Sequence, residues 1–451
     1  MPFLKRIIPI VLLILQAGAV FALLYASGRL NMKMYPDSEA YINFNFSSMT
    51  SILSHYRTFG YPLMLIFLKK MAIGYETVPF FHFGLHVFSV LFFYFCLLAY
   101  GFDNKRAFAA SSALFYTATV FMWTHAVATD APASSWAVIV LGLTFITATR
   151  PKNVFLWFSL TVALFYAYQI RPAMLFMVGI IPLFAFLLFL HHRPGNRQSA
   201  AMKRFVITAC FSAIMPVLLF CGLRFAFMGH FSLTSFGGYS LSGVALHMLS
   251  DDIVDQAPGE LRFLMEEIQK RRKEQHLVVA EKDEDSVRLY EEYLIPNQWG
   301  IAVVTAKEML GDDPVTIDDK LMAISRFVIS HKPVTYLKIV VKTWFIGMGN
   351  CIGKEPMVIA LFGLMAVLTG IRLARGHECS GGLFLFSRES GLLFVMAWLY
   401  VMFGMLLVSI AAPPLTRYIN QISVFIPSVL SVLCIDALDR PDIHAGINQK
   451  I

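Results

Sequence analysis

The chain has 451 residues, of which 57% are hydrophobic and 15% charged, and its mean hydropathy is +0.64. This composition excludes an ordinary water-soluble domain and predicts a polytopic membrane protein. The net charge of +8 does not indicate a nucleic-acid partner, because Lys and Arg lie between the apolar runs and form no basic face interleaved with aromatic residues. The six cysteines have neither metal-ligand nor paired spacing, so we expect no disulfide framework or zinc site.

The first apolar run covers about residues 7–27 and follows Lys5 and Arg6. A cleaved signal peptide is one interpretation, but the run is long and lacks a clear small-x-small cleavage motif, so we expect a retained span. Further runs long enough to cross a bilayer lie at about 77–102, 106–124, 131–148, 153–169, 173–191, 204–228, 354–374, 390–411 and 419–437. We therefore expect an all-α bundle of about ten transmembrane helices.

The charges between these runs indicate the orientation of the chain. With a cytoplasmic N-terminus, the inner connections hold Lys105 with Arg106, Arg150 with Lys152, the stretch 191–204, and Arg372 to Arg388, and all four are basic. This agrees with the positive-inside rule, although the first outer loop also carries some lysines and arginines. The outer segments are then the loop 28–76, the turns 125–130, 169–172 and 412–418, and the long segment 229–353.

This topology divides the chain into four parts. They are an N-terminal transmembrane module (1–228), an extracytoplasmic insert (229–353), C-terminal transmembrane helices (354–438) and a cytoplasmic tail (439–451). The insert is rich in charged residues and is expected to be mainly helical, and its end at 320–345 is expected to rest against the membrane. The run 61–74 is too short and too charged to span, and predicts a helix at the outer interface.

Acidic side chains stand at the outer ends of two predicted spans. Asp37 and Glu39, in YPDSEAY, would face the same way in an extended segment and could accept a proton or hold a divalent ion such as Mg²⁺ or Mn²⁺. A solvated helix cap explains them equally well. Asp130, in HAVATDAPA, opens another span, where N-capping by Thr129 or Asp130 is a sufficient explanation. His125 in the same stretch fits an interfacial histidine better than a ligand, and is kept as a candidate substrate contact.

Arginines stand at the same predicted side of the membrane. Arg57 and Tyr61 lie in RTFGYP, Arg171 lies in YQIRPAM, and Arg417 and Tyr418 lie in PPLTRYINQ. Headgroup snorkelling would explain any one arginine alone. Three arginines together with two acidic sites would suit an anionic lipid headgroup bound beside a general base.

These residues in this order resemble the C-type glycosyltransferases, membrane enzymes that include protein O-mannosyltransferases and lipid A aminoarabinose transferases. The resemblance rests on the acids after the first span, the R-x-x-G-Y-P motif, Asp130 and the Arg-Pro pair at 171–172; it covers 1–190 well, and 320–345 and 413–430 more loosely. It implies that Asp37 is the catalytic base, Glu39 its neighbour or a metal ligand, and Asp130 a second acid that orients the acceptor or the base. Ser38 separates acids that are adjacent in some relatives, and RTFGYP replaces a Glu-Lys-Pro-Pro type stretch, so phosphate binding by Arg57 is inferred from chemistry alone.

The expected function is transfer of a sugar from a polyprenyl-phosphate carrier to an extracytoplasmic glycan, lipid or protein, with inversion at the anomeric carbon. The expected setting is a bacterial inner membrane with the active site towards the periplasm, although an endoplasmic reticulum membrane has the same geometry. The alternatives are a ligase or polymerase of lipid-linked oligosaccharides, a lipid-sugar flippase or small-molecule carrier, and a noncatalytic assembly subunit. Carriers usually place charges near the membrane midplane and often contain a repeat, and neither feature is evident in the sequence.

Overall fold

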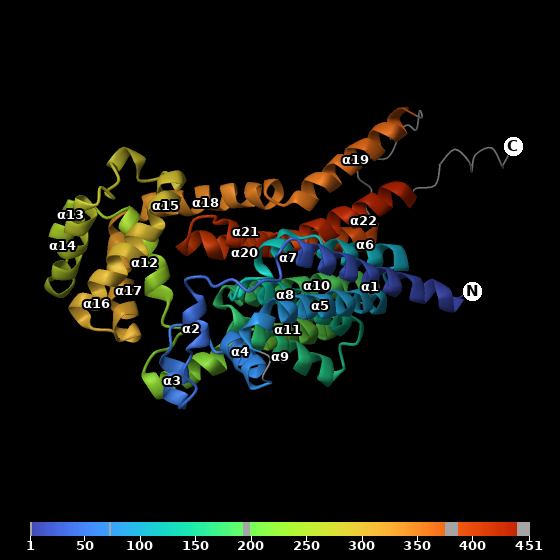
Figure 1. The fold of residues 1–451 in the computed structure, drawn as a ribbon, viewed down its shortest axis with the longest axis horizontal. Helices are drawn as coiled ribbons and strands as arrows, with labels where there is room; N and C mark the ends of the chain where they lie inside the picture. Colours follow the sequence, from blue (N-terminus) through green and yellow to red (C-terminus); the bar gives the residue numbers. More distant parts are fainter. Residues whose placement is uncertain (1, 72–73, 193–198, 375–386, 440–451) are drawn as a thin grey trace.

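A computed structural model describes residues 2–71, 74–192, 199–374 and 387–439 of the chain, and these residues are helical almost throughout (Figure 1). Within these ranges the β-structure consists of an isolated parallel bridge between Lys33 and Ala126. The prediction of an all-α protein is therefore confirmed for the described residues. Most of the predicted tail, from residue 440 onwards, and parts of two basic connections lie outside them.

Apolar helices form an elongated bundle. Six of them form single apolar segments of membrane-spanning length, α10 together with the turn of 3₁₀ helix before it: α1 (Pro2–Ala26), α5 (Val78–Tyr100), α8 (Asp130–Thr149), α10 (Met177–His192), α11 (Ser199–Met228) and α20 (Arg388–Ala411). Others complete the bundle: α6 (Asn104–Leu114), α7 (Ala118–Trp123), α9 (Val154–Ile170), α18 (Pro333–Gly353), α19 (Pro356–Ala374), α21 (Thr416–Ile422) and α22 (Ile426–Asp439). By length and composition, the described residues contain six helices able to cross a membrane, or up to eight if two bent pairs each count as one span. The chain is thus a helical membrane protein.

Two predicted spans differ from the expected straight helices. The run 106–124 forms α6 and α7, because the chain turns at Phe115 and Thr117 is extended, with ψ at 149°. The run 419–437 belongs to α21 and α22, which meet at an angle of 42°, and α18 meets α19 at 68°. The run 61–74 contains the short helix α4 (Gly60–Lys70).

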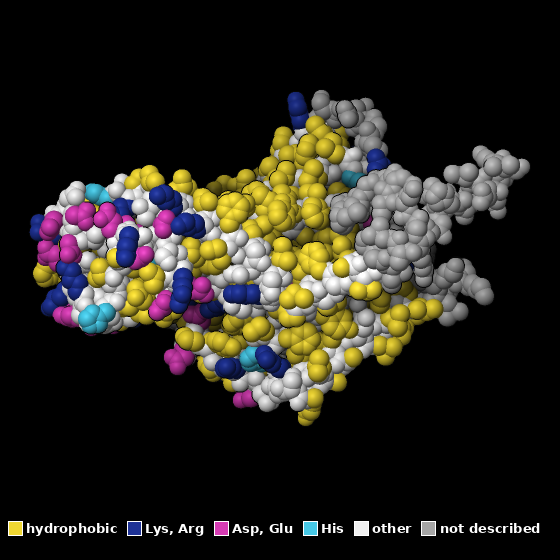
Figure 2. Space-filling view, turned by 90° about the horizontal axis from the view of Figure 1, so that it is seen from above, with side chains coloured by type: hydrophobic (Ala, Val, Ile, Leu, Met, Phe, Trp, Pro, Cys, Tyr) yellow, Lys and Arg dark blue, Asp and Glu magenta, His cyan; other side chains and the backbone are white. Residues whose placement is uncertain are grey.

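Side-chain chemistry divides the surface into an apolar body and a charged end. Figure 2 shows hydrophobic side chains covering much of the bundle, whereas Lys, Arg, Asp and Glu gather over the insert at one end. At the centre of the bundle α8 is 89% buried. It is rich in Ala, Ser and Thr, and such small residues let neighbouring helices approach closely.

The segment after α11 folds as a helical body at the end of the bundle opposite the start of α1 (Figure 1). Its helices are α12 (Gly237–His247), α13 (Asp251–Asp255), α14 (Gly259–Glu274), α15 (Val287–Ile295), α16 (Val303–Leu310) and α17 (Pro314–His331). They enclose a hydrophobic core of their own that extends from Tyr239 to Ile339, so α18 continues from this core into the bundle. Gly238 allows α12 to cross α17, since a Cβ there would lie 1.9 Å from the carbonyl oxygen of Asp318.

Asp318 gives this body a predicted pH dependence. Its Oδ1 accepts hydrogen bonds from the backbone N–H groups of Gly238 (2.7 Å) and Tyr239 (3.2 Å). Burial nevertheless raises the pKa of the carboxyl from 3.8 to about 6. The folded protein therefore binds this proton more tightly than the unfolded chain does. The resulting stabilisation is complete below the unfolded-state pKa and is lost as the pH rises through about 6.

We therefore expect thermal stability to decrease between about pH 4 and pH 7 more steeply in the wild type than in Asp318→Asn. The asparagine oxygen can accept the same two N–H bonds without carrying a charge. Thermal unfolding of both proteins across this range is the measurement. Identical pH profiles would show that Asp318 ionises in the folded protein as it does in the unfolded chain.

Candidate functional site

The segment after α1 is fastened to the start of α8. The N–H of Lys33 donates to the carbonyl of His125 (2.8 Å), and the N–H of Val127 donates to the carbonyl of Lys33 (3.0 Å). The Ser38 hydroxyl donates to the carbonyl of Val127 (2.7 Å). These bonds bring Asp37 beside Asp130, the first residue of α8.

Of the two interpretations of Asp37 and Glu39, the structure shows the start of a helix and not an extended segment, although the Asp37 side chain makes no capping hydrogen bond. Asp37 has helical dihedral angles (φ −78°, ψ −18°), and α2 (Ser38–Ile42) begins directly after it. The cause is Ser38, whose hydroxyl accepts the N–H of Tyr35 (2.8 Å) while donating to the neighbouring segment. Glu39 is exposed and forms no ion pair or side-chain hydrogen bond with the residues described, whereas Asp37 is half-buried and paired.

This geometry gives no support to the predicted metal site on Asp37 and Glu39. Both Asp37 oxygens are bonded to arginines. Within the part of the chain that the structure describes, no group of three or more His, Cys, Asp or Glu side chains gathers as metal ligands. A divalent ion therefore stays a prediction from the sequence.

The predicted acids and arginines do come together in one ion-pair network. Asp37 lies between Arg57 (Nη2 to Oδ1, 2.6 Å) and Arg417 (Nη1 to Oδ2, 3.1 Å). Asp130 lies between Arg417 (Nη2 to Oδ2, 3.1 Å) and Arg171 (Nη1 to Oδ1, 2.9 Å). Arg417 thus bridges two carboxylates that stand 380 and 287 positions away from it in the sequence.

The network is closed at one end and open at the other. The Asp130 side chain is fully buried and that of Arg171 is 7% exposed, whereas Asp37 is 22% and Arg417 28% exposed. When all are ionised, three guanidinium groups face two carboxylates, which leaves one positive charge in excess. The Nε of Arg57 is buried and has no hydrogen-bond partner among the described residues. The arrangement can accept an additional anion at its open end.

Aromatic rings surround the arginine at the open end. The Arg57 guanidinium lies 4.6 Å from the ring of Phe236, 5.2 Å from that of Tyr56 and 5.5 Å from that of Tyr41. Phe236 immediately precedes α12, so the insert contacts the site directly. Such contacts stabilise a guanidinium while leaving its edge free for hydrogen bonds.

A second group of aromatic rings lies beside Arg417 and Arg171. The Arg417 guanidinium is 5.8 Å from the ring of Trp123 and 6.0 Å from that of Tyr418, and the Arg171 guanidinium is 5.5 Å from Tyr418. The sequence indicated Tyr418 but neither Trp123 nor Phe236. The sequence signal for Trp123 would have been its position close to the predicted acid stretch. Aromatic residues are common at membrane interfaces, so position alone does not separate a site residue from an ordinary interfacial one.

Two predicted substrate contacts lie outside the network. Tyr61 is fully buried, shares a hydrogen bond with Nε2 of His82 (3.3 Å) and packs edge-on against Tyr41 at 5.1 Å. Tyr61 therefore packs against Tyr41, one of the rings around Arg57, and does not face the arginines itself. His125 has a half-buried ring 6.4 Å from that of Tyr35, and forms no side-chain contact with the acids or arginines in the described structure.

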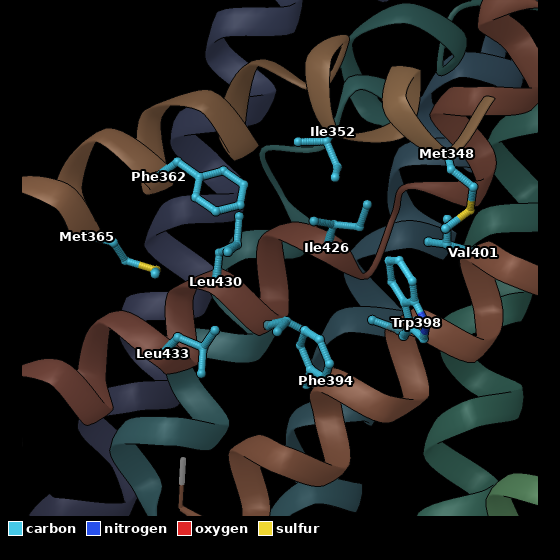
Figure 3. A pocket seen from close by; sticks show the side chains of 12 residues that line it. Met348, Ile352, Phe362, Met365, Phe394, Trp398, Val401, Ile426, Leu430 and Leu433 are labelled. Atoms are coloured by element: carbon cyan, nitrogen blue, oxygen red, sulfur yellow. The ribbon is translucent and has the colours of Figure 1, made fainter. Parts of the chain in front are cut away.

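An apolar cavity of about 270 Å³ lies between α18, α19, α20 and α22, and lining side chains such as Phe362 and Trp398 are also exposed at the surface of the bundle. Figure 3 shows side chains from all four helices around it, among them Met348, Phe362, Trp398 and Leu430. Met348 belongs to the same hydrophobic cluster as Tyr418, together with other cavity-lining side chains. One apolar cluster therefore joins the cavity to the arginine network.

Comparisons with family models, curated proteins and solved structures gave no match to the chain. The chemistry of the site is consequently argued from its own geometry. A half-exposed carboxylate beside guanidinium groups can accept a proton, and the guanidinium groups can bind a phosphate.

Proposed function

We propose that the protein is an integral membrane glycosyltransferase that moves a sugar from a polyprenyl-phosphate carrier to an extracytoplasmic acceptor, with Asp37 as the general base. The observation that carries the proposal is the partly exposed carboxylate of Asp37, which is bonded to Arg57 and Arg417 in a network that holds a third arginine, Arg171. The bundle would contain about ten spans in a bacterial inner membrane, with the network on the periplasmic side.

The proposed reaction is a single inverting displacement. The acceptor hydroxyl oxygen attacks the anomeric carbon, the bond from that carbon to the phosphate oxygen breaks, and the lipid phosphate leaves from the opposite face. Asp37 takes the hydroxyl proton as the new bond forms, when the hydroxyl becomes more acidic. Arginine side chains stabilise the negative charge that grows on the departing phosphate.

The arginines also explain how the base becomes available. Both oxygens of Asp37 are bonded to guanidinium groups, so neither is free to take the proton of an acceptor hydroxyl. A donor phosphate would compete with Asp37 for Arg57 and Arg417, since phosphate offers more acceptor oxygens and more charge than a carboxylate. Donor binding would thereby free the carboxylate for the acceptor hydroxyl.

The cavity suits the hydrocarbon part of the same donor. Its lining is apolar, and burying a methylene group is worth about 0.8 kcal/mol. The headgroup would lie at the arginines while the first isoprene units follow Tyr418 towards the cavity. The acceptor would approach from the side of the insert, where Phe236 contacts Arg57.

Partial filling of the cavity should weaken binding of the donor chain. Val429 lines the cavity, and we expect Val429→Phe to raise KM for a long-chain donor about tenfold and KM for a short-chain analogue by less than about twofold. Steady-state kinetics with the two donors measures this difference. Ile207→Phe, on the 66% exposed face of α11, is the matched control. An equal change for both donors would contradict a chain-binding role for the cavity.

The proposed activity has a direct test. The purified protein is incubated with a panel of polyprenyl-phosphate sugars, and consumption of each donor is followed by mass spectrometry. We expect one monophosphate-linked sugar to be consumed and free polyprenyl phosphate to appear. Failure to consume any of them would refute the proposal, and consumption of a pyrophosphate-linked oligosaccharide would favour the ligase or polymerase.

A further inference from the structure

Glu355 is a buried carboxyl group outside the arginine network. It lies in the joint between α18 and α19, directly before Pro356, and is 1% exposed. Among the residues that the structure describes, no Lys, Arg or His side chain pairs with it. A carboxyl group inside a membrane protein is costly unless its hydrogen bonds are satisfied, so its partners indicate its role.

Both oxygens of Glu355 bind short helices that are remote in the sequence. Oε1 accepts the backbone N–H of Ala118, the first residue of α7 (2.7 Å). Oε2 accepts the hydroxyl of Ser423, the residue that follows α21 (3.0 Å). Thr117, which precedes α7, uses its own hydroxyl on the carbonyl of Leu114, so Glu355 supplies the cap that α7 otherwise lacks.

These two helices also bind each other. The Thr119 hydroxyl of α7 donates to the carbonyl of Asn420 in α21 (2.6 Å), and the Asn420 amide approaches the Met122 sulfur (3.5 Å). α7 ends at Trp123 and α21 carries Arg417, whose guanidinium lies 5.8 Å from the Trp123 ring. The two helices that Glu355 binds therefore carry both partners of this cation–π contact.

We propose that Glu355 is a positioning residue of the arginine network: by bonding α7 and α21 together it fixes Arg417 between the two carboxylates. Its effect on sugar transfer rests on the proposed function, but its effect on the two helices does not. The joint that contains it links α18, which continues from the insert, to α19, which lines the cavity. The Glu355 side chain thus lies where the insert, the helices of the arginine network and the apolar cavity are linked.

Hydrogen exchange measured by mass spectrometry tests the positioning role without a substrate. In Glu355→Ala we expect exchange of the α7 and α21 amides to be about tenfold faster, because both bonds are lost. Glu355→Gln should behave like the wild type, since the amide oxygen can accept from Ala118 while the amide nitrogen donates to Ser423. Cys434→Ala, a buried substitution in α22, is the control and should leave both helices protected.

Unchanged exchange in Glu355→Ala would overturn the proposal, as would equally fast exchange in Glu355→Gln. If Glu355→Ala does not fold, Ser423→Ala replaces it, and faster exchange of α21 is then the expected result and unchanged exchange the contrary one. With an active donor, kcat/KM should fall about tenfold in Glu355→Ala and be restored in Glu355→Gln. If the wild type transfers no sugar, the proposed function fails while the exchange result still decides the role of Glu355.

Discussion

Asp37→Asn is expected to lower sugar transfer by about 10²–10⁴-fold while the protein stays folded and keeps its donor. The amide has the size of the carboxyl group, and its one oxygen can still accept a hydrogen bond from Arg57 or from Arg417, but it cannot take a proton from the acceptor. Because the side chain is partly exposed, we expect the fold to tolerate loss of its charge. Turnover of the purified variant, with donor binding followed by native mass spectrometry, measures both effects.

Glu39→Gln is the matched control for this substitution. Glu39 lies two residues away, is exposed and forms no ion pair or side-chain hydrogen bond with described residues, so we expect nearly wild-type turnover. An active Asp37→Asn protein would remove Asp37 from the role of base. An inactive Glu39→Gln protein would transfer that role to Glu39 and require the first loop to rearrange when substrate binds.

Asp130→Asn should destabilise the folded protein by about 3–5 kcal/mol, because it leaves the Arg171 and Arg417 guanidinium groups facing a neutral side chain in a buried site. The asparagine keeps the size of the side chain, so the loss reports on charge and not on packing. Thermal unfolding in detergent, with the folded fraction checked by size-exclusion chromatography, gives the measurement.

Asp103→Asn is the corresponding control at the start of α6. Asp103 also pairs with an arginine, Arg106, but its side chain is 45% exposed, so the substitution should cost at most about 1 kcal/mol. Equal stability of Asp130→Asn and the wild type would mean that Arg171 and Arg417 find other partners when the carboxylate charge is removed.

The sequence was sufficient to predict the participants of the ion-pair network. Charges beside apolar runs are costly unless they are paired or solvated, so Asp37, Asp130, Arg57, Arg171 and Arg417 could be singled out by position alone. The alternation of spans brought all five to one side of the predicted bundle. The pairings themselves required the fold, because Arg417 could have approached either acid.

Other features depend on contacts that a sequence does not display. Asp37 begins a helical turn because the Ser38 hydroxyl binds Val127, 89 positions away. Glu355 follows Lys354 and precedes a proline, which is typical of an ordinary loop, and only the approach of α7 and α21 makes it a buried link. The bent spans were missed for a similar reason, since a hydropathy window does not register a change of direction.

Arg417 follows α20 in the sequence, whereas the carboxylates that it joins belong to the segment after α1 and to α8. During synthesis, every helix up to α20 can therefore enter the membrane while Asp37 and Asp130 still lack their common cation. Insertion of α21 and α22 then supplies the cation that joins the two carboxylates. A product shortened before residue 417 would keep the earlier helices but lack the bridge between Asp37 and Asp130.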